Sequence, residues 1–371
     1  MNKLAIIGMG DMGSKYAKMI FEDRNLGYEI VATTRVKGNN LLRVQDYISN
    51  VIVYDSDKDL FDGFDRKEFE CDTVLVVTPH MAHKYAVIEG FKRGLSVLCD
   101  KPAAVSLKDG REMYESQNEN KYGFVFHHRT FPIYQELRNI IQSKKYGETL
   151  RVNFVVTDWF RINEYYTSSK WHARYKTDGG GILLNQCPHS LDLLCYVFGL
   201  PSYVFSMCNE GRYHDIEVED DVTTMLRWPD GTTGVFIAST GELTDINRME
   251  ISTTKALITV YKNHIEIKEN DKESSYYLNL GYKEYKAPIP KITRLEFEKN
   301  EPYKDIIKGF HDGNIFASGY DSLLSLYLSN AMYLSSWKNK AVELHSIGSE
   351  KELAFENEFE EELKKRQEMN D

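Results

Sequence analysis

A glycine-rich motif lies at the start of the chain, directly after a short apolar segment. Residues 3–7 have the composition of a buried strand, and Gly8-Met-Gly10-Asp-Met-Gly13 follows them without a gap. Glycines at this spacing permit a tight turn, let a pyrophosphate approach the backbone, and allow a helix to pack closely on a strand. The helical stretch that follows would present its N-terminal amides to the phosphates. This strand–turn–helix context predicts a dinucleotide-binding Rossmann domain.

Strands and helices alternate from this motif to about residue 128. Apolar strands are expected at 29–34, 73–77 and 96–99, with helices between them. This order predicts a parallel, doubly wound sheet in a domain of residues 1–128. Ligands of such sheets bind beyond the carboxyl ends of the strands. The cofactor-binding candidates at these ends are Gly8, Gly10, Asp11, Met12, Gly13, Thr34, Arg35, Thr78, Pro79, His83, Asp100, Lys101 and His128.

Arg35 bears on the identity of the cofactor. An NAD-binding domain usually places an acidic residue at the end of the second strand, to bind the ribose hydroxyls. Arg35 stands there instead and could form a bidentate contact with a 2′-phosphate. We therefore expect NADP in preference to NAD. The alternative is that Arg35 points into solvent.

A second glycine-rich motif, Gly179-Gly-Gly181, precedes an expected helix over 182–194. Asn185 and His189 are four residues apart, so one helix would present both on the same face. A pliable backbone followed by this polar pair suits a small hydroxylated substrate. The alternative is a loop before a core helix that carries an ordinary buried histidine.

The pattern changes after residue 128, and residues 129–371 are expected to form a second, α+β domain. Strands predicted over 149–156 and between 221 and 268 suggest one open, mainly antiparallel sheet with helices on one face. Aromatic residues gather between 157 and 176, and rings with polar edges suit the surface of a sugar. Arg161, Tyr166 and Trp171 are the substrate-binding candidates of this segment.

The ordered combination of motifs resembles the glucose–fructose oxidoreductase and inositol dehydrogenase family, also called Gfo/Idh/MocA. The motifs are Gly8-x-Gly10-x-x-Gly13, then Asp100-Lys101-Pro102, then the glycine triplet through His189-x-x-Asp192. The resemblance implies that Lys101 and His189 lie at a hydride-transfer site and bind substrate. It also implies a homodimer or homotetramer formed through the free face of the second sheet. Family members usually have Asp at the position of Asn185 and Glu at that of Asp100.

Asn185 cannot take a proton, so a catalytic base would have to be His189 or Lys101. Asn185 can still hold a substrate hydroxyl, and the segment from Asp158 to Trp171 is similar to a subgroup in which this asparagine is usual. We therefore predict a variant active site in which Lys101, Asn185 and His189 act together.

Composition excludes several other classes of protein. The net charge of −10 is unsuited to general binding of nucleic acid, and no apolar segment approaches the ~20 residues of a membrane span. The five cysteines are odd in number and include no Cys-x-x-Cys pair. This pattern favours reduced thiols in a cytoplasmic protein and predicts no metal site.

These observations predict an NAD(P)-dependent dehydrogenase that transfers a hydride to or from a ring carbon of a sugar or cyclitol. His189, with the near-neutral pKa of histidine, would be the acid–base group, and Lys101 would bind the reacting oxygen. One alternative is a glycoside hydrolase that retains its nucleotide and cleaves after transient oxidation. Another is a non-catalytic sensor of dinucleotide levels.

Overall fold

The computed structural model describes residues 1–34, 50–168 and 173–369. The chain forms two compact units, and each unit is built from two segments of sequence. The first unit contains Met1–Thr130 and Glu301–Leu326, and the second contains Phe131–Asn300 and Tyr327–Asp371. The third and last passage of the chain from one unit to the other falls inside one long helix, α12 (Gly319–Lys338). The division into functional domains at residue 128 stays a prediction.

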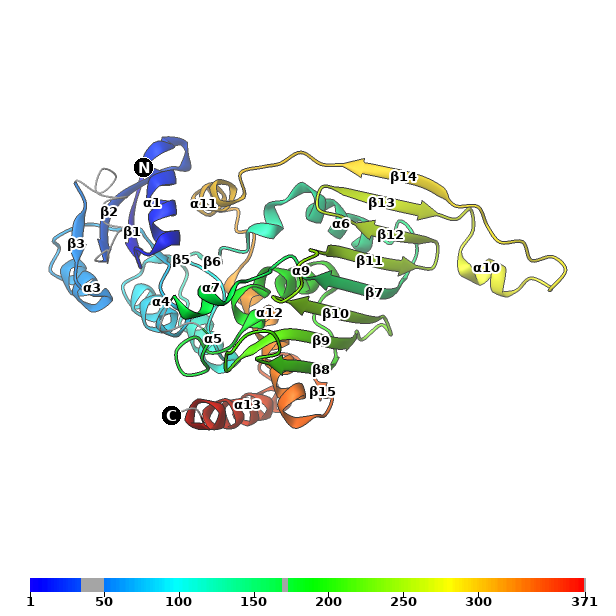
Figure 1. Cartoon of the computed structure of the whole chain (residues 1–371). Coiled ribbons are helices and arrows are strands. Elements are labelled where there is room, and N and C mark those ends of the chain that lie inside the picture. The colour runs from blue at the N-terminus through cyan, green and yellow to red at the C-terminus, as the bar shows by residue number, and fades with distance from the viewer. Residues whose placement is uncertain (35–49, 169–172, 370–371) are drawn as a thin grey trace. The chain divides into compact units, whose positions relative to one another are not determined.

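The first unit contains a six-stranded parallel sheet with the strand order β3-β2-β1-β4-β5-β6. Its strands are β1 (Asn2–Ile7), β2 (Tyr28–Thr34), β3 (Ile52–Tyr54), β4 (Thr73–Val76), β5 (Ser96–Cys99) and β6 (Tyr122–Phe124). The order reverses between β1 and β4, which is where the doubly wound fold leaves a ligand-binding crevice. The predicted Rossmann sheet is confirmed (Figure 1).

Helices of the first unit connect its strands and cover the sheet. They are α1 (Asp11–Glu22), α3 (Asp57–Asp65), α4 (His83–Lys92), α5 (Leu107–Glu115) and α11 (Pro302–Asp312), with short 3₁₀ turns at Arg24–Leu26, His80–Ala82 and His127–Thr130. α11 comes from the C-terminal part of the chain, and its Ile306 and Phe310 join the apolar core formed with β1 and α1. Lys121 fixes the end of α11 by hydrogen bonds from Nζ to the carbonyls of Phe310 (2.6 Å) and His311 (2.9 Å).

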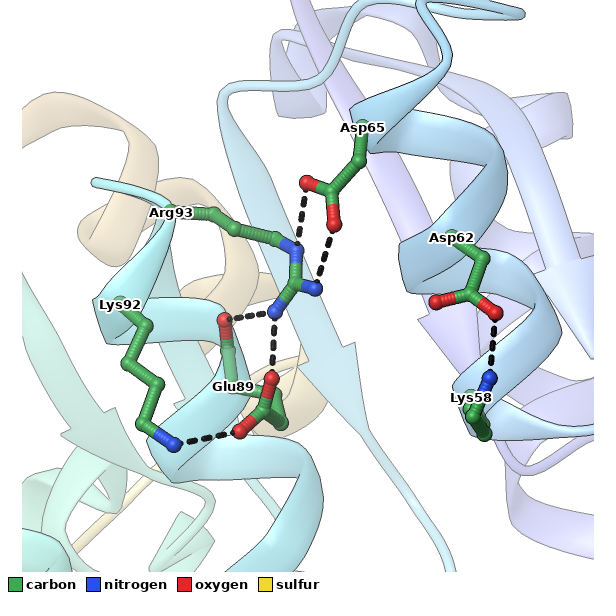
Figure 2. Close-up of polar contacts among 6 residues, drawn as sticks. All are labelled: Lys58, Asp62, Asp65, Glu89, Lys92 and Arg93. Carbon is green, nitrogen blue, oxygen red and sulfur yellow. Dashed lines mark hydrogen bonds and ion pairs between the residues drawn. The ribbon is translucent and has the colours of Figure 1, made fainter.

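An ion-pair network joins the C-terminal ends of α3 and α4 (Figure 2). Arg93 forms a two-pronged contact with Asp65, at 2.9 Å from Nε and 2.6 Å from Nη2, and also contacts Glu89 at 2.6 Å. Such a bidentate pair is stronger than a single surface contact. Lys58 and Asp62 form a simple i,i+4 pair on α3 nearby. The network stabilises the packing of two helices and lies outside the candidate site.

The second unit contains a nine-stranded sheet with the order β14-β13-β12-β11-β7-β10-β9-β8-β15. Its strands are β7 (Thr149–Val156), β8 (Tyr203–Glu210), β9 (Glu219–Arg227), β10 (Thr233–Ser239), β11 (Asn247–Thr253), β12 (Ala256–Val260), β13 (His264–Glu269), β14 (Lys291–Glu296) and β15 (Val342–Glu343). The described neighbours are antiparallel except β7 and β10, which run parallel. The expected open, mainly antiparallel sheet is confirmed (Figure 1).

Helices cover the buried face of this sheet, where alternate strand residues are inaccessible (Figure 1). The helices of the unit are α6 (Pro132–Gln142), α7 (Asn163–Thr167), α8 (Ile182–Asn185), α9 (Pro188–Phe198), α10 (Ser274–Leu278), α12 and α13 (Glu350–Met369). α12 is tied to β8 by the Ser206 N–H, which donates to Ser335 Oγ at 2.9 Å. α13 buries Phe359, whose ring stacks on Trp337 of α12 at 5.5 Å.

The continuous helix expected over 182–194 was wrong in one respect. The structure has two helices, α8 and α9, which are separated at Gln186 and Cys187. Pro188 has no N–H to continue the helical hydrogen-bond ladder, so it begins α9 instead of extending α8. Asn185 therefore ends one helix and His189 lies in the first turn of the next.

Candidate active site

The glycine-rich turn of the first unit has the geometry that a dinucleotide requires. Gly8 has a φ of 98°, and a Cβ there would lie 2.5 Å from the Val77 carbonyl oxygen. A Cβ on Gly13 would lie 2.1 Å from the Gly8 carbonyl oxygen, so the first turn of α1 can pack closely only because of this glycine. Around a Cβ on Gly10, by contrast, the described residues leave 4 Å clear. This open space lies at the N-terminus of α1, where a pyrophosphate would receive amide hydrogen bonds.

Two loops beyond the sheet are tied together by His83. Its Nε2 lies 2.8 Å from the Thr78 carbonyl oxygen and its Nδ1 lies 2.9 Å from that of Pro102. Burial lowers the pKa of His83, so the ring is neutral and donates from one nitrogen at a time. His83 thus joins the loop after β4 to the loop after β5, and its predicted contact with a cofactor stays a prediction.

Asp100 and Lys101 follow β5 at the same carboxyl edge of the sheet as the glycine turn. Asp100 Oδ1 accepts a 2.9 Å hydrogen bond from the Lys101 backbone N–H. Burial raises the pKa of Asp100, and the adjacent charge of Lys101 offsets part of the rise. Both residues therefore stand where the fold binds a cofactor.

A cluster of basic and aromatic side chains lies at this edge. Burial, aided by nearby His128 and by the charges of Lys101 and Lys15, lowers the pKa of His127 to about 3. Burial also lowers the pKa of His128 to about 4, so both histidines are neutral. Tyr303 of α11 packs its ring 4.7 Å from that of His127, and Lys15 Nζ lies 4.0 Å above the Tyr303 ring. Two lysines beside neutral rings give this edge a positive charge, which would suit a diphosphate.

The glycine triplet of the second unit is held by a buried carboxylate. Glu219 is fully buried, and its Oε2 accepts the Gly181 N–H at 3.0 Å. Its Oε1 accepts the Leu183 N–H at 2.9 Å and the Tyr333 hydroxyl at 2.6 Å. Within the part of the chain that the structure describes, these partners of Glu219 carry no positive charge, and burial raises the pKa of Glu219 to about 7. The turn is therefore anchored from β9 and α12 at once.

Asn185 holds the same turn from its other side. Its Nδ2 donates to Asp178 Oδ2 at 3.1 Å and lies 3.3 and 3.2 Å from the carbonyl oxygens of Gly180 and Gly181. Asp178 Oδ2 also accepts the Ala173 N–H at 3.1 Å. The amide of Asn185 is thus oriented with its nitrogen toward the turn, and its contact with a substrate hydroxyl stays a prediction.

His189 lies near the start of α9 and is 6% exposed. The break at Pro188 sets its orientation independently of α8, so the shared helix face expected for Asn185 and His189 does not exist. Its catalytic role, like those of Lys101 and Asn185, stays a prediction.

The aromatic segment places an arginine between two rings. The Arg161 guanidinium lies 5.4 Å from the Trp159 ring centroid and 4.9 Å from that of Tyr165. The Tyr165 hydroxyl accepts a 3.3 Å hydrogen bond from Gln186 Nε2. Arg161 and Tyr165 are therefore linked to the residue that directly follows Asn185.

Tyr166 packs against His214, and His214 also contacts the backbone of this segment. The Tyr166 hydroxyl donates to Thr240 Oγ1 at 3.1 Å, and burial raises its pKa to about 12. Its ring lies 4.7 Å from that of His214, whose Nε2 is 2.9 Å from the Arg161 carbonyl oxygen. His214 Nδ1 lies 2.8 Å from a carboxylate oxygen of Asp220. Tyr166 thus has a packing role here, and its substrate contact stays a prediction.

Two predicted site residues, Arg35 and Trp171, lie outside the described residues. Four residues that sequence reasoning missed are Tyr303, Glu219, Tyr333 and His214. The run Glu219-Asp-Asp at the start of a mostly buried strand was a usable signal, because acids there need buried partners. Across the part of the chain that the structure describes, no cluster of three His, Cys, Asp or Glu side chains could hold a metal ion. None of its helices has the length and apolarity to cross a membrane.

A Rossmann sheet followed by a large open sheet with a glycine-anchored polar turn defines a class of two-unit, dinucleotide-binding oxidoreductases. Comparison with family models supports this class for both parts of the chain. Residues 2–127 match the model of the oxidoreductase family with an NAD-binding Rossmann fold, and residues 134–259 match the GFO/IDH/MocA C-terminal domain. The chain belongs to the Gfo/Idh/MocA family of oxidoreductases.

Individual relatives are distant. The chain is 28% identical over 198 residues to trans-1,2-dihydrobenzene-1,2-diol dehydrogenase of Bos taurus, an alignment that covers 52% of this chain and 55% of that enzyme. The chain therefore spans little more than half the length of this curated relative.

Solved structures share the fold over nearly the whole chain. The WlbA dehydrogenase of Chromobacterium violaceum, in complex with NADH and UDP-GlcNAcA, has a TM-score of 0.75 at 22% identity and covers 93% of this chain and 96% of its own. Levoglucosan dehydrogenase, in complex with NADH and levoglucosan, also has a TM-score of 0.75, at 16% identity, and covers 93% of this chain and 100% of its own.

Proposed function

We propose that this protein is an NAD(P)-dependent dehydrogenase or reductase that interconverts a hydroxyl and a ketone at a ring carbon of a sugar or cyclitol. The observation that carries the proposal is the position of Lys101. It follows β5 at the carboxyl edge of the Rossmann sheet, two strands from the open turn at Gly10. An ammonium group there can reach the reacting end of a dinucleotide whose pyrophosphate lies over Gly10.

A nicotinamide cofactor held at this edge would supply the hydride acceptor or donor for the substrate carbon. His189 takes the hydroxyl proton in oxidation and returns it in reduction. Lys101 donates a hydrogen bond to the reacting oxygen and stabilises negative charge that develops on it. Asn185, with its nitrogen bound to the glycine turn, accepts a substrate hydroxyl through its oxygen. Arg161, Tyr166 and Trp171 would line the remainder of the substrate site.

The comparisons support this chemistry by analogy. The bovine relative is named a diol dehydrogenase, and the two structures of the same fold contain NADH with a sugar nucleotide or an anhydrosugar. For the cofactor we propose NADP in preference to NAD because of Arg35. The five cysteines are unbonded, which is consistent with the cytoplasmic location that we propose.

We also propose a homodimer or homotetramer formed through the uncovered face of the second sheet. Met207 and Met225 are 54% and 56% exposed on this face. Phe205, Met225 and Val235 pair across three neighbouring strands and make a continuous apolar row. An exposed apolar row of this kind is typical of a protein–protein contact.

The experiment is a screen of inositols, aldoses and keto-sugars by nicotinamide absorbance, with NAD and NADP run in parallel. On the best substrate, Lys101→Met and His189→Ala should each reduce kcat by about 10²–10⁴-fold, the usual contribution of general acid–base catalysis. The exposed Lys18→Met and the remote His264→Ala serve as matched controls. If the rates of the first two variants stay within about threefold of the parent rate, the assigned roles are wrong.

A further inference from the structure

Arg161 is a half-buried arginine without an acidic partner. Among the described residues its guanidinium forms no ion pair, and it hydrogen-bonds to neutral oxygens, the Phe160 carbonyl at 3.2 Å from Nη1 and the Tyr165 hydroxyl. Its Nε is buried and has no hydrogen-bond partner in that part of the chain. Two arginines of the same unit do form ion pairs, Arg212 with Asp221 at 2.6 Å and Arg366 with Glu210 at 2.8 Å.

This lack of a partner is not explained by a shortage of acids, because the chain has 56 Asp and Glu against 46 Lys and Arg. A charge withdrawn from water normally has a counter-charge or a full set of hydrogen bonds. The unmatched charge of Arg161 therefore indicates that an anion completes this part of the structure.

Arg161 is also held in place before any ligand arrives. Its backbone N–H donates to the Thr240 carbonyl at 2.9 Å, and its own carbonyl oxygen lies 2.9 Å from His214 Nε2. The Trp159 and Tyr165 rings flank the guanidinium. A fixed, planar cation loses little entropy when it binds an anion, and its forked donors match a carboxylate or a phosphate.

Several groups near Arg161 are donors, although the buried carboxylate of Asp178 also acts electrostatically on Tyr165. Trp159 Nε1–H is buried with no acceptor among the described residues, and Gln186 Nε2 is directed toward Tyr165. Burial raises the pKa of Tyr165, and the nearby Arg161 charge offsets part of that rise, so the tyrosine is a neutral hydroxyl. These donors lie beside Gln186, which directly follows Asn185.

We propose that Arg161 binds an anionic group of the substrate, so that the substrate is an acidic sugar or cyclitol bearing a carboxylate or a phosphate. This inference rests on the proposed dehydrogenase function and deepens it. A neutral polyol would leave the guanidinium charge uncompensated, whereas an anionic one would neutralise it.

The test compares related substrates with and without an anionic group. D-Glucose, D-glucuronate and D-glucose 6-phosphate form one set, and myo-inositol and its monophosphate form another. With the parent enzyme, at least one anionic member of a set should have a kcat/KM about 10- to 100-fold above its neutral counterpart, as a charge-assisted hydrogen bond provides. The carboxylate and phosphate arms separate the two sources of anion.

Arg161→Gln should remove that preference: kcat/KM for the anionic member should fall about 10- to 100-fold, mainly through a higher KM, and kcat/KM for the neutral member should fall by a smaller factor. Arg294→Gln is the control, because it removes an exposed arginine of β14 that pairs with Glu296. The proposal is overturned if neutral members are preferred by the parent enzyme, or if Arg161→Gln affects charged and neutral members equally.

Turnover of neutral sugars alone would leave the dehydrogenase assignment intact and refute only the role of Arg161. Absence of turnover with every substrate would refute the proposed function. In that case, calorimetric binding of glucuronate and glucose 6-phosphate decides the inference separately: equal affinity for the parent protein and Arg161→Gln, or no binding, overturns it.

Discussion

The backbone N–H of Gly181 donates a 3.0 Å hydrogen bond to Glu219 Oε2, and this contact joins the glycine triplet to a strand 38 residues further along the chain. The backbones of Gly181 and Glu219 are also closely packed, because a Cβ on Gly181 would lie 2.0 Å from the Glu219 backbone oxygen. The turn that leads to Asn185 is therefore fixed both by a hydrogen bond and by close packing. We interpret Glu219 as a positioning residue for the candidate site.

Glu219 should make stability depend on pH in a defined direction. Burial raises its pKa from 4.5 to about 7 in the folded protein. The folded state therefore binds this proton more tightly than the unfolded state does, so the contribution to stability is full below pH ~4.5 and is lost as pH rises toward ~7. The expected loss is about 3 kcal/mol, at 1.36 kcal/mol for each unit of pKa.

Chemical denaturation at intervals from pH 5 to pH 8 measures this effect against Glu219→Gln, which has no proton to exchange. The difference in unfolding free energy between the parent protein and the variant should change across that range and become constant above pH 8. Parallel curves for the two proteins would mean that Glu219 does not titrate there. Tyr333→Phe, which removes one donor to the same carboxylate, should raise the pKa of Glu219 further.

Alanine substitutions at Gly10 and Gly13 should have different effects, one on cofactor binding and the other on the stability of the fold. Gly10 has a φ of −76° and clear space around its Cβ position, so Gly10→Ala should leave the melting temperature unchanged while its methyl group weakens dinucleotide binding at least about tenfold. Gly13→Ala forces a Cβ against the Gly8 carbonyl oxygen and should destabilise the protein by about 1–3 kcal/mol. Thermal unfolding without cofactor and nicotinamide fluorescence titration measure the two effects. Equal losses of stability in both variants would contradict this separation.

The first strand, the glycine turn and the first helix depend on local sequence, and they were predicted correctly. Gly8, Gly10 and Gly13 act within one turn, and the period and length of their flanking segments predict the strand and the helix. The same reasoning failed between Asn185 and His189, because helical spacing was extended across Pro188, which has no N–H for the ladder. Helical spacing predicts a shared face only within one continuous helix. Because Pro188 begins a new helix, Asn185 and His189 are oriented independently.

Groups brought together by the tertiary fold could not be predicted in this way. Tyr333 lies 114 residues from the Glu219 carboxylate that it contacts. Tyr303 belongs to a late helix that returns to the first unit and packs on His127. No short motif relates such residues, so only the buried acids at the start of β9 gave a signal in the sequence.

His214 should set the position of Arg161 through its hydrogen bond to the Arg161 carbonyl. His214→Phe keeps a ring against Tyr166 but removes the contacts to Asp220 and to Arg161. We expect a loss of about 1–3 kcal/mol in stability, because a buried carboxylate loses a donor, and a rise in KM that exceeds the fall in kcat. Steady-state kinetics and denaturation measure both, with His264→Phe on β13 as the control. An unchanged KM would show that the Arg161 backbone does not depend on this ring.

We expect the chains of the homo-oligomer to contact one another through the uncovered face of the second sheet. Met225 is exposed in the centre of the apolar row and pairs with Phe205 on one side and Val235 on the other. A charge in the middle of such a row would be buried without a partner in an oligomer but would remain hydrated in a monomer. Met225→Glu should therefore reduce the mass measured by light scattering to that of one 43.0 kDa chain without changing the circular dichroism spectrum. Leu243→Glu, at an 82% exposed loop position, should leave the mass unchanged. An oligomer that survives Met225→Glu would place its interface elsewhere on the molecule.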